Sequence, residues 1–311
     1  MPLKAPLSRW EIFSRGYVQL AVVLLVIQLR EGPGTVICLD ALGSVMEAAS
    51  EIGMALLDIQ NVCHAFGGLV ALDSVTFSVF PDQIKAVIGP NGAGKTTLFN
   101  VVSGILRSDT GDVLLEGSPI TGLQPYEIGQ RGISRTFQNL SLFAHMSVLE
   151  NVMVGCHCRT RAGIISSALR LPRHRRDERQ AREKSLEYLA AVGLADRRDW
   201  PVAELPFGQR RLVELARALA TEAKLLLLDE PASGLNTKET DDLGQIICQI
   251  RDRGIAILLV EHDMSLVMDI SDSIFVLNFG KPVAEGPPTE IRSDPEVISI
   301  YLGGDFDSVT D

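Results

Sequence analysis

Residues 89–97, GPNGAGKTT, have the composition and spacing of a loop that binds the phosphates of a nucleotide. Glycine has no Cβ, so the backbone N–H groups of such a loop can turn toward phosphate oxygens. Lys95 would supply a cation for the β and γ phosphates, and the Thr96 hydroxyl can ligate Mg²⁺. The expected nucleotide-binding residues are Gly89, Pro90, Asn91, Gly92, Ala93, Gly94, Lys95, Thr96 and Thr97.

The sequence around this loop favours phosphate binding over the alternative, a glycine-rich turn in which the Lys-Thr pair occurs by chance. An apolar run at 84–88 precedes the loop, and a helical pattern over 95–105 begins within it. Phosphate binding at a helix N-terminus requires a strand, a glycine-rich loop and a helix in this order. The loop alone leaves kinases, GTPases and many ATPases open, but no guanine-reading N/T-K-x-D element follows an apolar strand.

A second apolar run, 225–228, ends in Asp229, Glu230 and Pro231. Ligands of open α/β sheets bind at the carboxyl ends of the strands, so acids at this point are placed for chemistry. Asp229 could hold Mg²⁺, and Glu230 could orient and deprotonate an attacking water molecule. The alternative is a strand that ends in solvated acids, and the phosphate loop in the same chain favours the catalytic interpretation.

A segment before a helical pattern, 205–211 with the sequence LPFGQRR, resembles the signature of ABC ATPases, usually LSGGQ. The resemblance extends from about residue 56 to 303. Pro206 replaces a serine whose hydroxyl is able to contact the γ phosphate, and Phe207 replaces the first glycine. Gly208 and Gln209 remain, and proline is tolerated near the start of a helix. The resemblance to the family therefore holds, although the hydrogen bond from the usual serine to the γ phosphate is not expected here.

The resemblance implies further site residues in the expected order along the chain. Phe66 would stack on adenine, Gln138 would touch Mg²⁺ and face a permease, and His262 would lie beside the γ phosphate. Residues 233–236 resemble the D-loop, with Asn236 in place of the usual aspartate. Taken alone, Phe66 reads as a core residue, Gln138 as a surface amide and His262 as a structural histidine.

Motifs and resemblance together predict an ATPase that uses ATP and Mg²⁺. The expected catalytic residues are Lys95, Glu230 and His262, and the expected metal ligands are Thr96, Gln138 and Asp229. Phe66, Gln138, Gly208 and Gln209 complete the expected nucleotide site.

The signature also implies a dimer in which each subunit completes the ATP site of the other, either a homodimer or a heterodimer with a sister ATPase. A closer resemblance is to ATPase subunits of importers for branched-chain amino acids and related amides or urea. It implies two integral-membrane permease subunits, an indirectly associated extracytoplasmic substrate-binding protein, and a place on the cytoplasmic face of the inner membrane. The segments that carry it are 66–77, 135–143, 147–155, 229–239, 261–291 and 297–303.

Two other functions are alternatives. A soluble ABC ATPase acting on nucleic acid or ribosomes would be expected to have a second cassette, a long coiled coil or a basic surface. The chain instead carries 39 acidic against 29 basic residues, a net charge of −10, which disfavours generic phosphate neutralisation. A module that binds ATP without turnover would be expected to lack the catalytic residues named above. We therefore expect an importer ATPase and no nucleic-acid partner.

An α/β fold would position these residues, because short β-rich runs alternate with helical patterns. Several strands are continuous apolar runs, typical of a mainly parallel sheet covered on both faces. The resemblance implies a P-loop NTPase core, a small antiparallel β subdomain and an inserted helical subdomain at about 140–220. The clearest strands are 75–80, 84–88, 113–116, 225–228, 255–260 and 273–277, and the clearest helices 95–105, 177–192, 207–220 and 238–253.

The chain is expected to divide into an N-terminal extension, 1–53, an ABC ATPase domain, 54–303, and a C-terminal tail, 304–311. The apolar run at 17–29 is shorter than the about 20 residues that span a bilayer. It also lacks the small-residue cleavage site of a signal peptide. A fusion remnant or upstream start, a membrane-surface anchor and a packed extension are the alternatives for the first 53 residues.

Cysteine usage fits a reducing compartment. The chain has five cysteines in 311 residues, an odd number in a chain too long to need a disulfide framework. Cys156 and Cys158 flank His157 without a second ligand pair at zinc-like spacing, so they are expected to be reduced thiols. The arginine-rich stretch 159–184 is expected to be a solvated helical face or loop.

Overall fold

The computed structural model describes residues 54–136, 141–156 and 172–303, with the backbone alone at 172–175 and 302–303. The chain divides after Gly53 into two units, Met1–Gly53 and Met54–Asp311, and the elements below belong to the second. The assignment of 54–303 as one ATPase domain and of 1–53 as an extension stays a prediction.

A six-stranded sheet has the order β10-β9-β3-β8-β7-β6, and all its pairs are parallel except β10 with β9. Strands β3, β7 and β8 are buried at every residue, as the apolar runs predicted. The strands are β3 (Ile84–Ile88), β6 (Ile133–Arg135), β7 (Leu225–Asp229), β8 (Ala256–Val260), β9 (Ser273–Asn278) and β10 (Lys281–Gly286).

A second, antiparallel sheet has the order β2-β1-β4-β5. Its strands are β1 (Leu57–Phe66), β2 (Leu69–Val79), β4 (Thr110–Leu115) and β5 (Ser118–Pro119). Its apolar side chains and those of α4 (Lys95–Val102) share one core cluster with a face of the large sheet. The β3–α4 turn, which holds the phosphate loop, therefore stands on a rigid two-sheet base.

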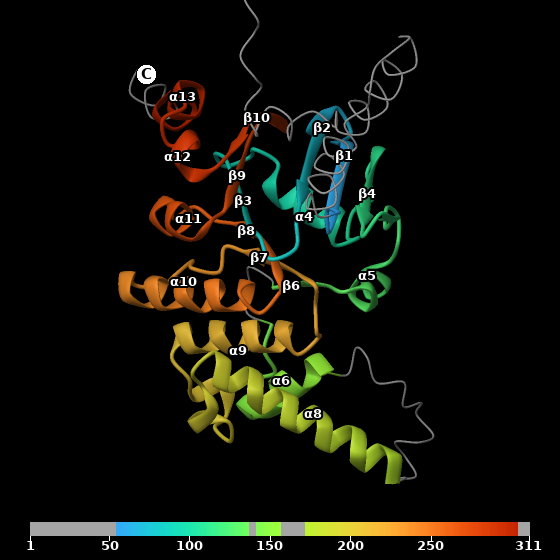
Figure 1. Cartoon of the computed structure of the whole chain (residues 1–311), viewed down its shortest axis with the longest axis vertical. Helices are drawn as coiled ribbons and strands as arrows, with labels where there is room; N and C mark the ends of the chain where they lie inside the picture. The colour runs from blue at the N-terminus through green and yellow to red at the C-terminus, as the bar shows by residue number, and fades with distance from the viewer. Residues whose placement is uncertain (1–53, 137–140, 157–171, 304–311) are drawn as a thin grey trace, which may run out of the picture. The chain divides into compact units, whose positions relative to one another are not determined.

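Successive side chains of a strand point to opposite sides, so the two faces of the large sheet pack against different elements. Val87 of β3 faces α4 and the antiparallel sheet, whereas the alternate residues Ile84, Ala86 and Ile88 face the helices described next. One cluster joins the sheet to α6 (Val148–Cys156), α9 (Phe207–Leu219) and α10 (Thr237–Arg251), and Figure 1 shows α6, α8 (Pro172–Ala191) and α9 grouped together. Another cluster joins it to the C-terminal helices. These are α11 (Met264–Ile270), α12 (Pro288–Ile291) and α13 (Pro295–Gly303). The remaining described elements are a short helix, α5 (Pro125–Arg131), and 3-10 turns at Ala195–Arg197 and Val202–Glu204.

Glycine allows α6 and α9 to approach closely. A Cβ on Gly155 of α6 would lie 2.2 Å from the carbonyl oxygen of Arg217 in α9 and 2.9 Å from Cβ of Ala220. Only a residue without a side chain fits this crossing, because a real Cβ does not approach backbone so closely.

Several predicted boundaries were wrong by a few residues. The helix expected over 95–105 ends at Val102, because Gly104 turns the chain at φ 74. The strand expected over 75–80 begins earlier, at Leu69, where it forms a hairpin with Phe66. In the part of the chain that the structure describes, every helix is too short or too polar to cross a membrane.

Candidate functional site

The phosphate loop connects β3 to α4, as predicted. Gly94 forms the N-cap of α4 at φ 105, and a Cβ there would lie 2.4 Å from the carbonyl oxygen of Ala71. Gly92, at φ 80, has open space where its Cβ would point, with no atom within 4 Å. The loop thus combines glycines of positive φ with open space beside Gly92, as a loop that binds an anion through backbone N–H groups requires.

The Lys95 ammonium lies inside this loop. Its Nζ donates hydrogen bonds to the carbonyl oxygens of Gly89, at 2.6 Å, and Pro90, at 2.9 Å, and the residue is only 6% exposed. Burial lowers the pKa of Lys95, and the carboxylates of Glu230 and Asp229 raise it part of the way back. Among the residues that the structure describes, the ammonium uses two of its three donors, so the site fits an additional anionic ligand such as a phosphate oxygen.

Asp229 ends β7 and is 4% exposed. Its Oδ2 accepts a hydrogen bond of 2.7 Å from Nη2 of Arg135, at the end of the neighbouring strand β6. Arg135 also donates from Nη1 to Asn100 Oδ1, at 2.7 Å, and to Ser103 Oγ, at 3.0 Å, on and just after α4. Sequence reasoning missed Arg135 as a site residue, although its place before the predicted Gln138 was the available signal.

Glu230 and His262 meet at the carboxyl ends of adjacent strands. His262 Nε2 lies 3.0 Å from Glu230 Oε1, and the backbone N–H of Glu230 donates to Val260 O at 2.8 Å. Glu230 has φ 48, a left-handed conformation that is uncommon for a residue with a side chain. Such backbone strain concentrates at functional sites, where the surrounding structure holds it.

Phe66 is exposed at the hairpin between β1 and β2, with 51% of its surface accessible. It is therefore no core residue. The ring of His64 packs edge-on against it at 4.6 Å between centroids, which leaves an aromatic ring held in place at the surface.

The signature begins α9. Pro206 is its N-cap residue, and the Phe207 ring packs against Gly234, where a Cβ would lie 3.0 Å from its edge. Gly208 is half-buried against Glu239, and Gln209 Oε1 accepts a hydrogen bond of 2.5 Å from Arg197. The structure thus brings the signature against residues 234–239 of the same chain. It also pairs Glu230 with His262 and places the Glu230 and Asp229 carboxylates near enough to raise the pKa of Lys95.

Thr96 is exposed at the second position of α4, Asn91 is exposed, and Ala93 is buried beneath the loop. Thr97, one residue into the helix from Thr96, is half-buried. Gln138 lies outside the described residues.

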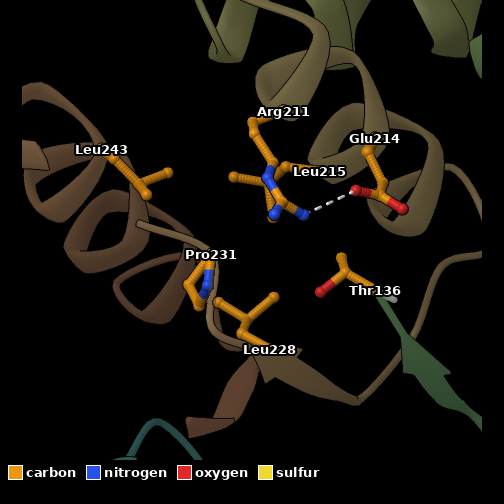
Figure 2. A pocket seen from close by; sticks show the side chains of 7 residues that line it. All are labelled: Thr136, Arg211, Glu214, Leu215, Leu228, Pro231 and Leu243. Carbon is orange, nitrogen blue, oxygen red and sulfur yellow. Dashed lines mark ion pairs between the residues drawn. The ribbon is translucent and has the colours of Figure 1, made fainter. Parts of the chain in front are cut away.

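Figure 2 shows a pocket of about 10 Å³ that borders the residues flanking the carboxylates. Buried Arg211 and Glu214, both on α9, form an ion pair of 3.5 Å along its wall. The volume is about what one water molecule requires. Its lining residues are Thr136, Arg211, Glu214, Leu215, Leu228, Pro231 and Leu243.

Known proteins share this architecture and sequence. The family described as ABC transporter matches residues 72–233, just over half of the chain, and the family described as branched-chain amino acid ATP-binding cassette transporter matches 281–307. A crystallised ATP-binding cassette of an ABC transporter in its ADP conformation superposes with a TM-score of 0.70 at 33% identity, covering 80% of this chain and 99% of that one. The parallel-sheet fold and the resemblance inferred from the sequence are confirmed.

Among curated relatives, the high-affinity branched-chain amino acid transport ATP-binding protein LivG of Escherichia coli K12 is 41% identical over 249 residues, 80% of this chain and 98% of LivG. BraF of Pseudomonas aeruginosa, described in the same words, is 42% identical over the same shares. The probable LivG of Archaeoglobus fulgidus is 37% identical over 250 residues, 80% of this chain and 96% of its own. The chain therefore belongs to the ATP-binding cassette family of ABC transporters, which hydrolyses ATP to power transport.

Proposed function

We propose that this chain is the ATPase subunit of an importer for branched-chain amino acids or related amides and urea. The observation that carries the proposal is the similarity to LivG and BraF over 98% of their lengths. The match of residues 281–307 to the branched-chain family adds a second, C-terminal segment. Cargo selection would lie with the membrane subunits and the binding protein.

ATP would bind with its triphosphate along the loop from Gly89 to Thr97. Lys95 would turn its ammonium from the carbonyl oxygens of Gly89 and Pro90 toward the β and γ phosphates, gaining charge-assisted hydrogen bonds. The α4 N-terminus adds unpaired N–H donors to the same anion. Phe66, already exposed and braced by His64, would stack on adenine.

The residues fit a hard divalent cation, because they offer oxygen ligands beside the phosphate loop. Thr96, Asp229 and Gln138 would hold Mg²⁺, and Arg135 orients the Asp229 carboxylate from the other side. When bound, Mg²⁺ neutralises charge on the phosphates.

Glu230 would act as the base that takes a proton from the attacking water, and its left-handed backbone aims it out of β7. His262 would hold the Glu230 carboxylate through Nε2 and lie beside the γ phosphate. Gly208 and Gln209 would cap the phosphates of a partner subunit, as the family resemblance implies. The assembly would be a dimer, with itself or with a sister ATPase, on two permease subunits at the cytoplasmic face of the inner membrane. An extracytoplasmic binding protein would deliver the cargo.

Membrane reconstitution tests this proposal. The chain is co-expressed with two permease subunits of a branched-chain amino acid importer, purified with them and placed in vesicles with the corresponding binding protein. We expect ATP hydrolysis that rises when a binding protein loaded with a branched-chain amino acid is added. A chain that purifies only with ribosomes or DNA, and never with permeases, would refute it.

A further inference from the structure

Glu261 is a buried acid directly after β8, 4% exposed and without a role in the mechanism above. It stands one residue before His262 along the chain. It also lies at the same strand end as Glu230, because Asp229 of β7 is paired with Val260 of β8. A buried carboxylate at this point needs hydrogen-bond donors. The donors that it has show which segments of the backbone it fixes.

The two oxygens of the Glu261 carboxylate hold two different loops. Oε1 accepts a hydrogen bond of 2.7 Å from the backbone N–H of Ala232, in the loop after β7. Oε2 accepts one of 2.9 Å from the N–H of His262 and a longer one of 3.4 Å from that of Asp263. The Glu261 side chain thus links the backbone of Ala232, 29 positions earlier in the sequence, to the backbone of His262.

The loop after β7 carries Glu230 in its strained conformation. Its first residue is tied to β8, since Glu230 N donates to Val260 O at 2.8 Å; within the loop, Ser233 N donates to Glu230 O at 3.2 Å and Leu235 N to Ala232 O at 3.0 Å. Beyond these, the Phe207 ring covers Gly234 from the signature side. The bond to Glu261 therefore fixes the side of this loop that faces His262.

The loop after β8 carries His262, which is 44% exposed at its side chain. Asp263 next to it caps α11 by accepting from Ser265 N and Leu266 N. The cap fixes where the helix starts, and the Glu261 carboxylate fixes how the loop leaves the strand. Both loop positions together set the distance of 3.0 Å between His262 Nε2 and Glu230 Oε1.

We propose that Glu261 is a positioning residue for ATP hydrolysis, which holds Glu230 and His262 in register by tying their loops together. The inference rests on the proposed roles of those two residues. A carboxylate suits the task because it is acceptor-only and can serve both backbone donors at once. A glutamine has one oxygen and one NH₂ group. Its oxygen would accept a hydrogen bond from one loop, and its NH₂ group would face a backbone N–H donor of the other loop, where no hydrogen bond can form.

The test measures turnover, ATP affinity and thermal stability of the full-length Glu261→Gln variant. We expect kcat to fall at least tenfold while the Kd for ATP, measured directly, stays within about threefold. Asp272→Asn is the matched control, since the Asp272 carboxylate also accepts a backbone N–H, that of Ile84 at 2.8 Å, but at the opposite end of the strands. It should lose stability and keep kcat within twofold.

A double-variant comparison separates positioning from general destabilisation. In a Glu230→Gln background the base is already gone, so adding Glu261→Gln should lower the residual rate by less than twofold. If Glu261→Gln does not fold, Glu261→Asp keeps both acceptors on a shorter side chain and should lower kcat severalfold with unchanged ATP affinity.

The inference is overturned if Glu261→Gln, or Glu261→Asp in its place, retains wild-type kcat. It is also overturned if the tenfold loss recurs in the Glu230→Gln background, or if Asp272→Asn loses as much turnover. These results are distinct from failure of the proposed function, which would show as wild-type turnover in Glu230→Gln itself.

Discussion

Lys95 is a buried cation whose described hydrogen bonds are to two backbone carbonyls of its own loop. An ammonium in this position is poised to exchange partners, because a phosphate oxygen makes a stronger, charge-assisted hydrogen bond than a neutral carbonyl. The carboxylates of Glu230 and Asp229 raise the pKa of Lys95 against the effect of burial, and Asp229 is itself paired with Arg135. Lys95 would therefore receive an anion, and the carboxylates close to it would act on water.

Replacing Lys95 by alanine is expected to weaken ATP binding about 10- to 100-fold, because a hydrogen bond to a charged group contributes about 1.5–3 kcal/mol. Titration calorimetry with ATP measures the change. Lys224→Ala is the control, since Lys224 pairs with Glu116 at 2.6 Å on the surface and should leave ATP affinity unchanged. Wild-type affinity in Lys95→Ala would contradict the assignment of the phosphate loop.

The elements that carry these residues differ in how well the sequence predicts them. The phosphate loop and the acids after β7 could be found because each is a local motif joined to an apolar strand. β6 could not, since Ile133–Arg135 is too short for any periodicity to show.

The contacts between distant residues were also missed. Arg135 and Asp229 are 94 positions apart, and Ala232 and Glu261 are 29 apart, so their pairing depends on the order of strands in the sheet. The exposure of Phe66 could be expected only from the family resemblance, which implies a ring that stacks on adenine; the residue type alone favours the core.

The crossing of α6 and α9 gives a prediction for stability. Gly155→Ala is expected to destabilise the protein by about 1–3 kcal/mol, because its Cβ would collide with the backbone of α9. Gly129→Ala in α5 is the matched control: no atom lies within 4 Å of its Cβ, so alanine should stabilise by up to about 1 kcal/mol. Urea unfolding of both variants measures the difference, and equal stabilities would show that the helices are not so tightly packed.

At the scale of the whole molecule, Met54–Asp311 is one compact unit by its contacts, and the core clusters among its described residues link both sheets to the helices. A fragment spanning 54–303 is therefore expected to fold cooperatively and bind ATP within about threefold of the full chain. Calorimetric unfolding and ATP titration of fragment and full chain compare the two. If the fragment does not unfold cooperatively, the expectation is wrong and residues 1–53 are needed for the domain to fold.

The signature at the start of α9 is proposed to act on a partner subunit. Its Gly208 and Gln209 would complete the ATP site of a partner, so binding of ATP would favour the dimer by mass action. Hydrolysis and phosphate release would then open it, and this cycle would move the permeases.

The most direct measurement is sedimentation and turnover of Glu230→Gln saturated with ATP and Mg²⁺. We predict ATP affinity within about threefold of wild type, hydrolysis at least about 100-fold slower because the general base is lost, and a dimer that reverts to monomer when ATP is removed. Wild-type hydrolysis would contradict the role of Glu230 as general base. A variant that stays monomeric with ATP bound would contradict a dimer that closes around the nucleotide.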